Sequence, residues 1–190
     1  MTAGARPLRA DARRNRERLL EVAEAVFTEK GTGASTEEIA RQAGVGIGTV
    51  FRHFPTKEAL LAAVYARLLG RLGETARELA DHPDPGAAFY DFVTLAVGHS
   101  STKNAFADAL TEAGVAVPET DDNDRPFLSD ALETLLRHAQ RAGAVRDDIG
   151  LGDLRAVLIG ISRAVEHAPE ADGASAHIAA VLLDGLRPPR

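Results

Sequence analysis

The sequence of 190 residues contains no cysteine. The chain therefore cannot form disulfides, thiolate zinc sites or iron–sulfur centres, and it offers no thiol nucleophile. It also lacks long apolar runs, because the longest, residues 60–66 and 178–183, fall far short of the roughly 18 residues that span a bilayer. No apolar stretch follows the N-terminal arginines, so a signal peptide is not indicated. We expect a cytoplasmic protein without a membrane-spanning segment.

Glycine and proline, at 17 and 9 residues, are together too few for a disordered or collagen-like chain. Hydrophobic residues make up 45% and charged residues 26%, close to the averages of globular proteins. A chain of this length forms one ordinary domain, or a small domain joined to a medium one, with a true core.

The net charge of −6 hides an uneven distribution along the chain. Residues 1–58 carry ten basic and eight acidic residues, a charge of +2, whereas residues 59–190 carry −8. The first twenty residues alone reach +4. Cations placed against phosphates supply most of the affinity of DNA-binding proteins, so the N-terminal part is the candidate for nucleic acid. A run of arginines by itself is equally typical of a solvated tail.

Apolar residues recur at steps of three and four along nearly the whole chain, which predicts an all-α fold of about nine helices. Ser35 and Glu38 have the spacing of a capping box, and Thr56 is placed to cap the longest helix. We expect helices over residues 9–30, 36–43, 47–54, 57–80, 86–99, 102–113, 125–142, 151–168 and 174–186.

Two of these helices, 36–43 and 47–54, are short and are joined by a three-residue turn that contains glycine. In this arrangement a first helix braces a second helix across DNA. The buried side would comprise Ile39, Ala40, Ala43, Val50 and Phe54, with Val45 filling the turn. An ordinary helical hairpin has the same apolar pattern, so the pattern leaves a DNA-binding motif and a plain hairpin both open.

The residues themselves go further, since GTVFRHFPTKE at 48–58, with TEEIA at 36–40, resembles the N-terminal domain of the TetR family of transcriptional regulators. The resemblance covers about residues 13–62, and beyond them it is one of layout only. It implies a helix-turn-helix DNA-binding domain with an arginine-rich arm over residues 1–56. Residues 57–190 would then form a helical ligand-binding and dimerisation domain.

The resemblance also implies which residues contact DNA. Thr36 would bind a phosphate, Thr49 and Arg52 would reach base edges, and His53 and Lys57 would hold the backbone. The full set is Arg13, Thr36, Ile47, Gly48, Thr49, Phe51, Arg52, His53 and Lys57.

The chain departs from the family pattern at three positions near this motif. Phe51 stands where the family often has tyrosine, so one phosphate bond is lost while the ring is kept. Ile47 stands where a polar or basic residue is common, so any contact there is apolar. Gly46 replaces the usual serine cap, at a cost of only a few tenths of a kcal/mol. Gly48 fits the pattern, because it would let the helix approach the duplex closely.

For the C-terminal part, the resemblance implies a homodimer and a small-molecule effector. Two apolar stripes would pair with their symmetry copies: Leu154, Leu158, Ile161 and Val165 on one helix, and Ile178, Val181 and Leu182 on the next. Both stripes are also what core helices look like. An effector cavity would be lined by Tyr65, Phe89, Phe92, His99, Phe106 and Phe127, although aromatics at such spacing are commonly plain core.

Together these observations predict a DNA-binding transcriptional regulator, with a repressor released from a palindromic operator by a small molecule as the specific hypothesis. The partners would be double-stranded operator DNA, the effector and a second copy of the chain. We expect no cofactor, no metal and no enzymatic activity. The six histidines form no metal-like pair along one helix, so a zinc enzyme has no support. The alternative is an all-helical enzyme or protein-interaction module without DNA binding, which would show no salt-dependent affinity for DNA.

Overall fold

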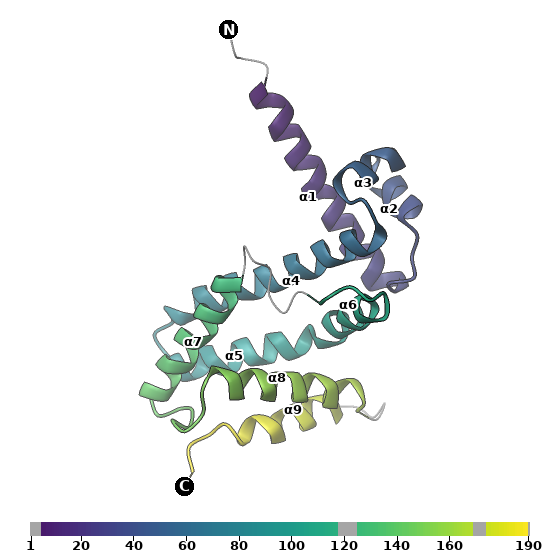
Figure 1. Cartoon of the computed structure of the whole chain (residues 1–190). Coiled ribbons are helices and arrows are strands. Elements are labelled where there is room, and N and C mark those ends of the chain that lie inside the picture. The colour runs from purple at the N-terminus through teal and green to yellow at the C-terminus, as the bar shows by residue number, and fades with distance from the viewer. Residues whose placement is uncertain (1–4, 118–124, 169–173, 190) are drawn as a thin grey trace. The chain divides into compact units, whose positions relative to one another are not determined.

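The computed structural model describes residues 5–117, 125–168 and 174–189, without the side chains of 5–12 and 125–127. Within that part of the chain the structure is all-α, with nine helices and no strand, as predicted (Figure 1). The helices are α1 (Ala5–Lys30), α2 (Thr36–Ala43), α3 (Ile47–His53), α4 (Lys57–Ala80), α5 (Pro85–Gly98), α6 (Ser100–Glu112), α7 (Arg125–Arg141), α8 (Leu151–Glu166) and α9 (Ala174–Asp184).

Most helix boundaries lie within two residues of the predicted ones, because the residues that set them are readable locally. Ser35 begins α2 as its N-cap, and the Thr56 side chain accepts a hydrogen bond from the Ala59 amide at 3.0 Å at the start of α4. The main difference is α1, which begins at Ala5 and not near Arg9. None of the helices within the described ranges is long and apolar enough to cross a membrane.

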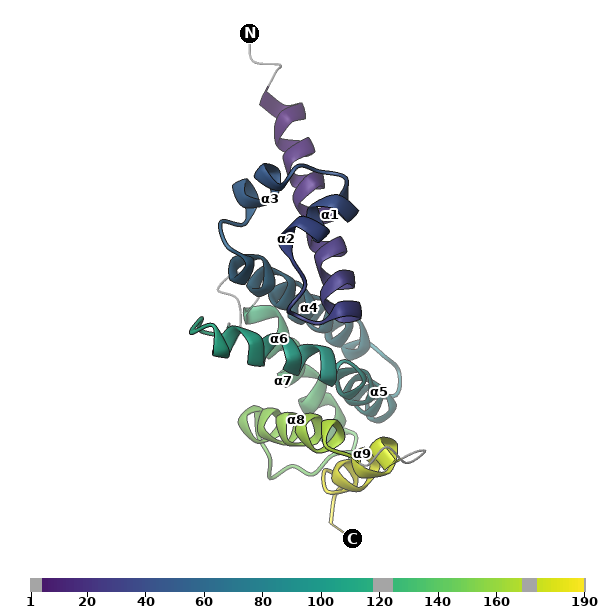
Figure 2. The ribbon, with the colours of Figure 1, turned by 90° about the vertical axis from the view of Figure 1, so that its right-hand side faces the viewer.

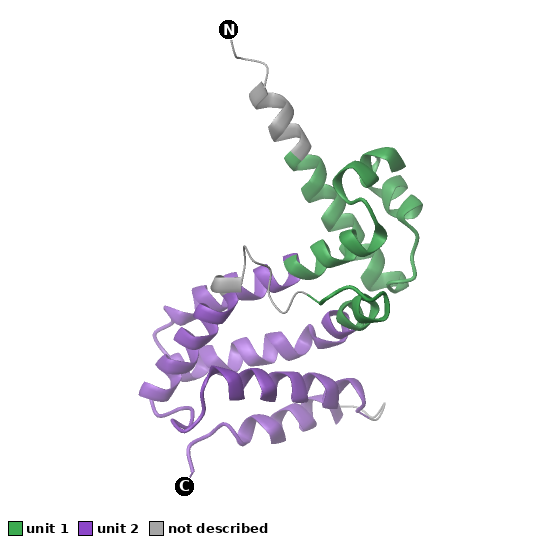
Figure 3. Cartoon of the chain, viewed as in Figure 1, with its two compact units in different colours: residues 1–66, 105–118 green, residues 67–104, 119–190 purple. Residues whose placement is uncertain are grey.

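The chain divides into two compact units (Figure 3). The first comprises residues 1–66 and 105–118, and the second comprises residues 67–104 and 119–190. Both α4 and α6 contribute residues to each unit. The predicted division into 1–56 and 57–190 is a functional one, and it remains a prediction.

In the first unit α2 packs against α1, and α3 packs against α2 (Figure 2). Its buried residues include Leu19, Ala23 and Phe27 on α1, together with Ile39 on α2 and Val50 on α3. The Phe27 ring also meets the Phe106 ring of α6 edge to face, with centroids 6.2 Å apart. The end of α6 therefore belongs to the same core as the first helices.

The second unit has its own core, to which α5, α7 and α8 contribute most. Phe89 and Phe92 of α5 are 1% and 2% exposed, and Leu135 of α7 and Leu154 of α8 are equally buried. Phe89 is steadied by an edge-to-face contact with Tyr90, at 5.3 Å between centroids. α8 and α9 lie side by side in both views (Figures 1 and 2).

Candidate nucleic-acid interface

The bracing helix α2 is fixed at its start by a cap and an ion pair. Ser35 has extended backbone, and its hydroxyl accepts a hydrogen bond from the Glu38 amide at 3.2 Å. The Glu38 carboxylate does not complete the predicted capping box in the observed bonds; it accepts from Lys30 at the end of α1, from Arg41 at 3.4 Å and from Gln42 at 3.3 Å. The bond from Lys30 is the main cause that holds the pKa of Glu38 below its ordinary value.

The turn between α2 and α3 depends on one glycine. Gly44 has φ of 68°, in the left-handed region, where a side chain is strained by roughly 1–2 kcal/mol. Its amide and that of Val45 close the end of α2 onto the carbonyls of Arg41 and Ala40. Gly46 then caps α3 with its backbone alone, because the Thr49 amide donates to the Gly46 carbonyl at 2.8 Å. These bonds fix where α3 begins.

The reading helix α3 buries only one side. Val50 is fully buried, as predicted, and Phe54 directly after the helix is 3% exposed. Ile39, Ala40 and Ala43 of α2 are buried as well, which agrees with the packing expected from the sequence. The exposed residues are Ile47, Gly48, Phe51 and Arg52, while Thr49 and His53 are half-buried.

One arginine of α1 lies at the C-terminal end of α3, and another lies at the turn that ends α2. The Arg16 guanidinium stands over the Phe54 ring, 5.1 Å from its centroid, at the C-terminal end. A Cβ placed on Gly44, in the turn before the helix, would lie 3.8 Å from a terminal nitrogen of Arg18. Sequence reasoning recognised the arginine run but selected only Arg13, because contacts between α1 and α3 are not visible in a local pattern. Arg13 itself is exposed and lies 3.7 Å from Glu17.

The remaining predicted DNA contacts lie at the edges of the same unit. Thr36, the first residue of α2, is 8% exposed, so only a small part of its side chain reaches the surface. Lys57, the first residue of α4, is half-buried. Residues 39–57 contain Arg41, Arg52 and Lys57 and no carboxylate. The unit therefore presents cations around α3, as phosphate binding requires.

The predicted effector residues are divided between the two units. Tyr65 and Phe106 belong to the first unit, where both are buried, and burial raises the pKa of Tyr65. Phe89 and Phe92 belong to the core of the second unit. His99 is exposed at the C-terminal end of α5, and the side chain of Phe127 lies outside the described part of the chain.

The predicted dimer stripes divide into core and surface. Leu154 and Ile161 are buried in the second unit, and Leu158, Val165 and Ile178 are half-buried. Val181 and Leu182 of α9 are 56% and 41% exposed.

Sequence reasoning missed Ile159 of α8, although it is 59% exposed, because it lies off the regular stripe of that helix. An apolar groove of about 360 Å³ runs between α8 and α9, lined by Val157, Gly160, Ile161, Ala164, Leu182, Gly185 and Leu186.

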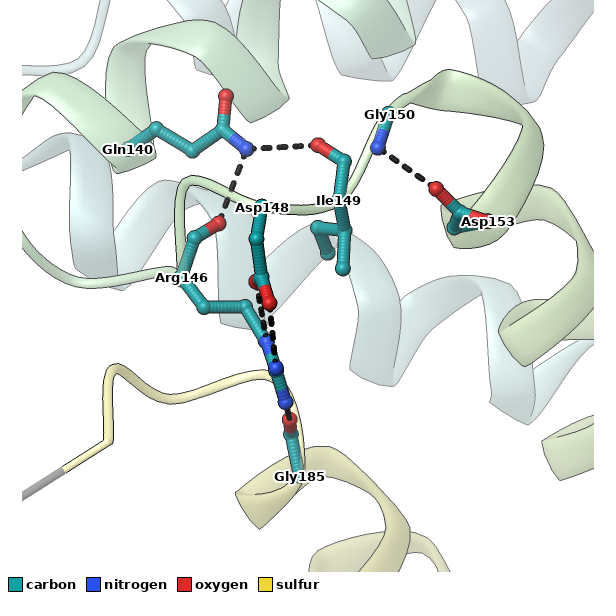
Figure 4. A network of polar contacts seen from close by, with 7 residues as sticks. All are labelled: Gln140, Arg146, Asp148, Ile149, Gly150, Asp153 and Gly185. Atoms are coloured by element: carbon teal, nitrogen blue, oxygen red, sulfur yellow. Dashed lines mark hydrogen bonds and ion pairs between the residues drawn. The ribbon is translucent and has the colours of Figure 1, made fainter.

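A polar network fastens the end of α9 beside this groove (Figure 4). Arg146 binds the Asp148 carboxylate through two hydrogen bonds of 2.5 and 2.6 Å, which lowers the pKa of Asp148. Its amide donates to the Leu186 carbonyl at 2.9 Å, and its guanidinium reaches the Gly185 carbonyl at 3.4 Å. The Gln140 side chain secures the loop by donating to the carbonyls of Arg146 and Ile149, both at 2.9 Å.

Two family models match the chain in succession. The model for bacterial regulatory proteins of the tetR family matches residues 19–64, and the C-terminal domain of SbtR-like transcriptional regulators matches residues 84–188. An HTH-type transcriptional regulator of Staphylococcus aureus (strain USA300) is 41% identical over 61 residues, 32% of this chain. That match spans only 33% of the length of this curated relative.

Solved structures match over nearly the whole chain. The TetR transcription regulatory protein of Mycobacterium vanbaalenii is 39% identical, with a TM-score of 0.73 over 95% of this chain and 99% of that one. The TetR transcriptional regulator SCO0520 of Streptomyces coelicolor is 34% identical, with a TM-score of 0.71 over 92% and 99% of the two chains. The complex of RolR with its ligand resorcinol, at 20% identity and a TM-score of 0.60 over 93% and 89%, shares the fold.

Proposed function

The chain belongs to the TetR family of transcriptional regulators, and from that premise we propose that it represses transcription by binding a palindromic operator as a homodimer. The observation that carries the proposal is the exposure of α3. Its Arg52 is exposed, Arg16 of α1 stands over Phe54 at the C-terminal end of α3, and Arg18 of α1 lies near Gly44 in the turn before α3. Arg52 is suited to a bidentate bond with guanine, and Thr49 to a hydrogen bond or methyl contact. The arginines ahead of α1's buried stripe, Arg13 among them, would clamp phosphates or follow the groove.

A single helix of seven residues reads too few bases for a specific site, which is why symmetric dimers read two half-sites one DNA turn apart. In this proposal α8 and α9 form the dimer contact. The exposed side chains of Ile159, Val181 and Leu182 supply the apolar surface. Gly160, Ala164 and Gly185 line the groove with small side chains and so allow a helix of the partner to approach closely.

The second unit would receive a small-molecule effector whose binding weakens the hold on DNA. The predicted boundary between residues 56 and 57 belongs to this hypothesis, because it separates the DNA-binding part of the chain from the effector-binding part. An effector changes operator affinity only if it binds the DNA-binding conformation and the released conformation with different affinities, and the size of the change is limited by that difference. A coupling of about 1–3 kcal/mol would change operator affinity about 5- to 150-fold. The bound resorcinol of RolR is the precedent for a small ligand in this fold.

Selection of genomic fragments by the full-length protein at moderate salt tests DNA recognition directly. Operator fragments recovered in this way provide the duplexes for two variants. We expect Arg52→Ala to relax preference at one base position. Lys57→Ala should weaken binding similarly on all sequences and reduce the slope of affinity against salt by about one.

Arg137→Ala serves as the matched control, because this exposed arginine lies on α7 in the second unit. It should leave both the salt slope and the base preference unchanged. Absence of any sequence-selective fragment in the selection would overturn the proposed function.

A further inference from the structure

The exposed surface of α3 is divided into strips of different chemistry. Each residue turns an α-helix by about 100°, so residues four apart share a strip. Gly48 and Arg52 lie opposite the buried Val50 and form the central strip. Ile47 and Phe51 form the strip on one side, and Thr49 and His53 form the strip on the other.

The strip of Ile47 and Phe51 is apolar and is left uncovered. Ile47 is 37% and Phe51 is 43% exposed, and neither side chain has a hydrogen-bonding group. The fold draws little benefit from them, because burial and not exposure is what stabilises such side chains. Arg52 follows Phe51 directly, and Arg18 approaches the turn before Ile47. An apolar strip bordered by cations is complementary to an apolar feature that lies between phosphates.

We propose that Ile47 and Phe51 select operator positions by contact with the C5 methyl groups of thymine. The inference rests on the proposed function, since it concerns which base edges α3 reads. The thymine methyl is the apolar feature that distinguishes one base pair from the others in the major groove. Cytosine and the purines present donors and acceptors there, which neither side chain is able to satisfy. Gly48 lies beside this strip, and a Cβ placed on it would have no neighbouring atom within 4 Å. No other part of the fold therefore blocks the approach of a duplex to the α3 backbone at this position.

Replacing thymine by uracil tests the inference, because the exchange removes the methyl group and leaves every hydrogen-bonding atom in place. Operator duplexes obtained by genomic selection are synthesised with uracil at one thymine pair of symmetry-related positions at a time. At the contacted positions we expect the wild-type protein to bind about fourfold more weakly for each methyl group removed, the loss expected for one apolar carbon withdrawn from contact. Other thymines should tolerate uracil.

The variants Ile47→Ala and Phe51→Ala complete a double-mutant cycle with the same duplexes. The variant that has lost the contact should bind thymine and uracil duplexes equally well. Leu95→Ala is the matched control, because Leu95 is a similarly exposed leucine, 38% exposed, on α5 in the second unit. This variant should retain the full uracil effect.

The outcomes separate this inference from the proposed function. Failure to recover any selective DNA fragment would remove the function and the inference with it. Selective binding that is insensitive to uracil at every thymine overturns only the thymine contact. A uracil effect that persists in both Ile47→Ala and Phe51→Ala also overturns it, since the methyl group would then act through another side chain such as Thr49 or through the shape or stiffness of the duplex. The wild-type measurement needs no variant, so insensitivity to uracil at every thymine overturns the contact even where a variant is unstable.

Discussion

Nothing in the fold requires a glycine at position 48. Its φ lies outside the left-handed region, and a Cβ built on it meets nothing within 4 Å. Glycine costs an α-helix up to about 1 kcal/mol relative to alanine, so the residue makes α3 less stable than it needs to be. The proposed close approach to DNA gives this cost a reason.

We predict that Gly48→Ala raises the free energy of unfolding, by up to about 1 kcal/mol. The same variant should weaken operator binding roughly 5- to 150-fold, the equivalent of one displaced base contact of about 1–3 kcal/mol. Urea unfolding and operator titration measure the two effects. Gly152→Ala is a close control, because Gly152 is also the second residue of a helix after a glycine cap and is also exposed with open space around it. Equal affinity of Gly48→Ala and wild type would show that the close approach does not occur.

At this scale, the burial of individual residues around α3 could be predicted from the sequence. Val50, Phe54 and Ile39 are buried as expected, because helical periodicity alone decides their side of the helix. The positions of Arg16 and Arg18 could not be predicted. Their contacts, with Phe54 after α3 and near Gly44 after α2, depend on how α1 packs in the first unit, which is a tertiary property.

Among the helices, α2 depends on its contacts with α1 for its position. Eight residues are too few for a stable isolated helix, so the contacts to α1 decide where it lies. Lys30 at the end of α1 binds the Glu38 carboxylate, and Arg41 and Gln42 reach it from the next turn. The orientation of the bracing helix therefore depends on an ion pair as well as on its apolar face.

This ion pair predicts a pH dependence of stability. The pKa of Glu38 is lowered below 4.5, chiefly by the bond from Lys30, so the folded state favours the charged carboxylate. The stabilisation is complete above the pKa of the unfolded carboxyl and is lost as pH falls through the lower value of the folded state. Glu38→Gln should thus be less stable than wild type at pH 7, and the difference should shrink below pH 4.5.

Chemical denaturation at a series of pH values measures that difference. Glu37→Gln removes a charge from the adjacent, exposed position. The free energy of unfolding of this variant should stay close to that of wild type at every pH. A Glu38→Gln deficit that stays constant down to pH 3 would contradict the assignment.

The helices themselves were the most predictable part of the fold, and α8 shows where prediction from sequence ends. Leu154, Leu158 and Ile161 repeat regularly, and this pattern is the same for a core and for an interface. In the structure Leu154 and Ile161 turn out to be core, whereas the exposed Ile159 interrupts the pattern. Only the packing of α8 on its neighbours separates the two uses.

For the whole molecule, the proposed dimer surface depends on where α9 ends. Arg146 holds the Gly185 and Leu186 carbonyls, and the Arg187 guanidinium stands over the Tyr90 ring at 4.9 Å. These contacts hold the residues directly after α9, of which Gly185 and Leu186 line the groove between α8 and α9. The apolar residues Val181 and Leu182 are thereby presented from a helix that is anchored at its C-terminal end.

We predict that Val181→Glu converts the proposed dimer into monomers, because pairing would bury a carboxylate without a partner. The dimer dissociation constant should rise at least roughly a hundredfold, in line with a penalty of about 3 kcal/mol or more. Sedimentation velocity over a range of concentrations measures it, and operator affinity should fall in parallel. Leu95→Glu introduces the same charge at an exposed leucine of α5 and should leave the mass unchanged. A Val181→Glu variant that remains dimeric would place the interface elsewhere.

The contact between Phe27 and Phe106 bears on how the protein is dissected. The first unit draws residues 105–118 from far along the chain, and no local pattern predicts this. A shortened expression product that stops at residue 66 would retain Phe27 but forfeit Phe106 and Leu110, both of which are buried in the intact chain. The Phe27 ring of that product would be exposed and would favour aggregation. Studies of the first unit by itself should therefore combine residues 1–66 with a second peptide that supplies residues 105–118.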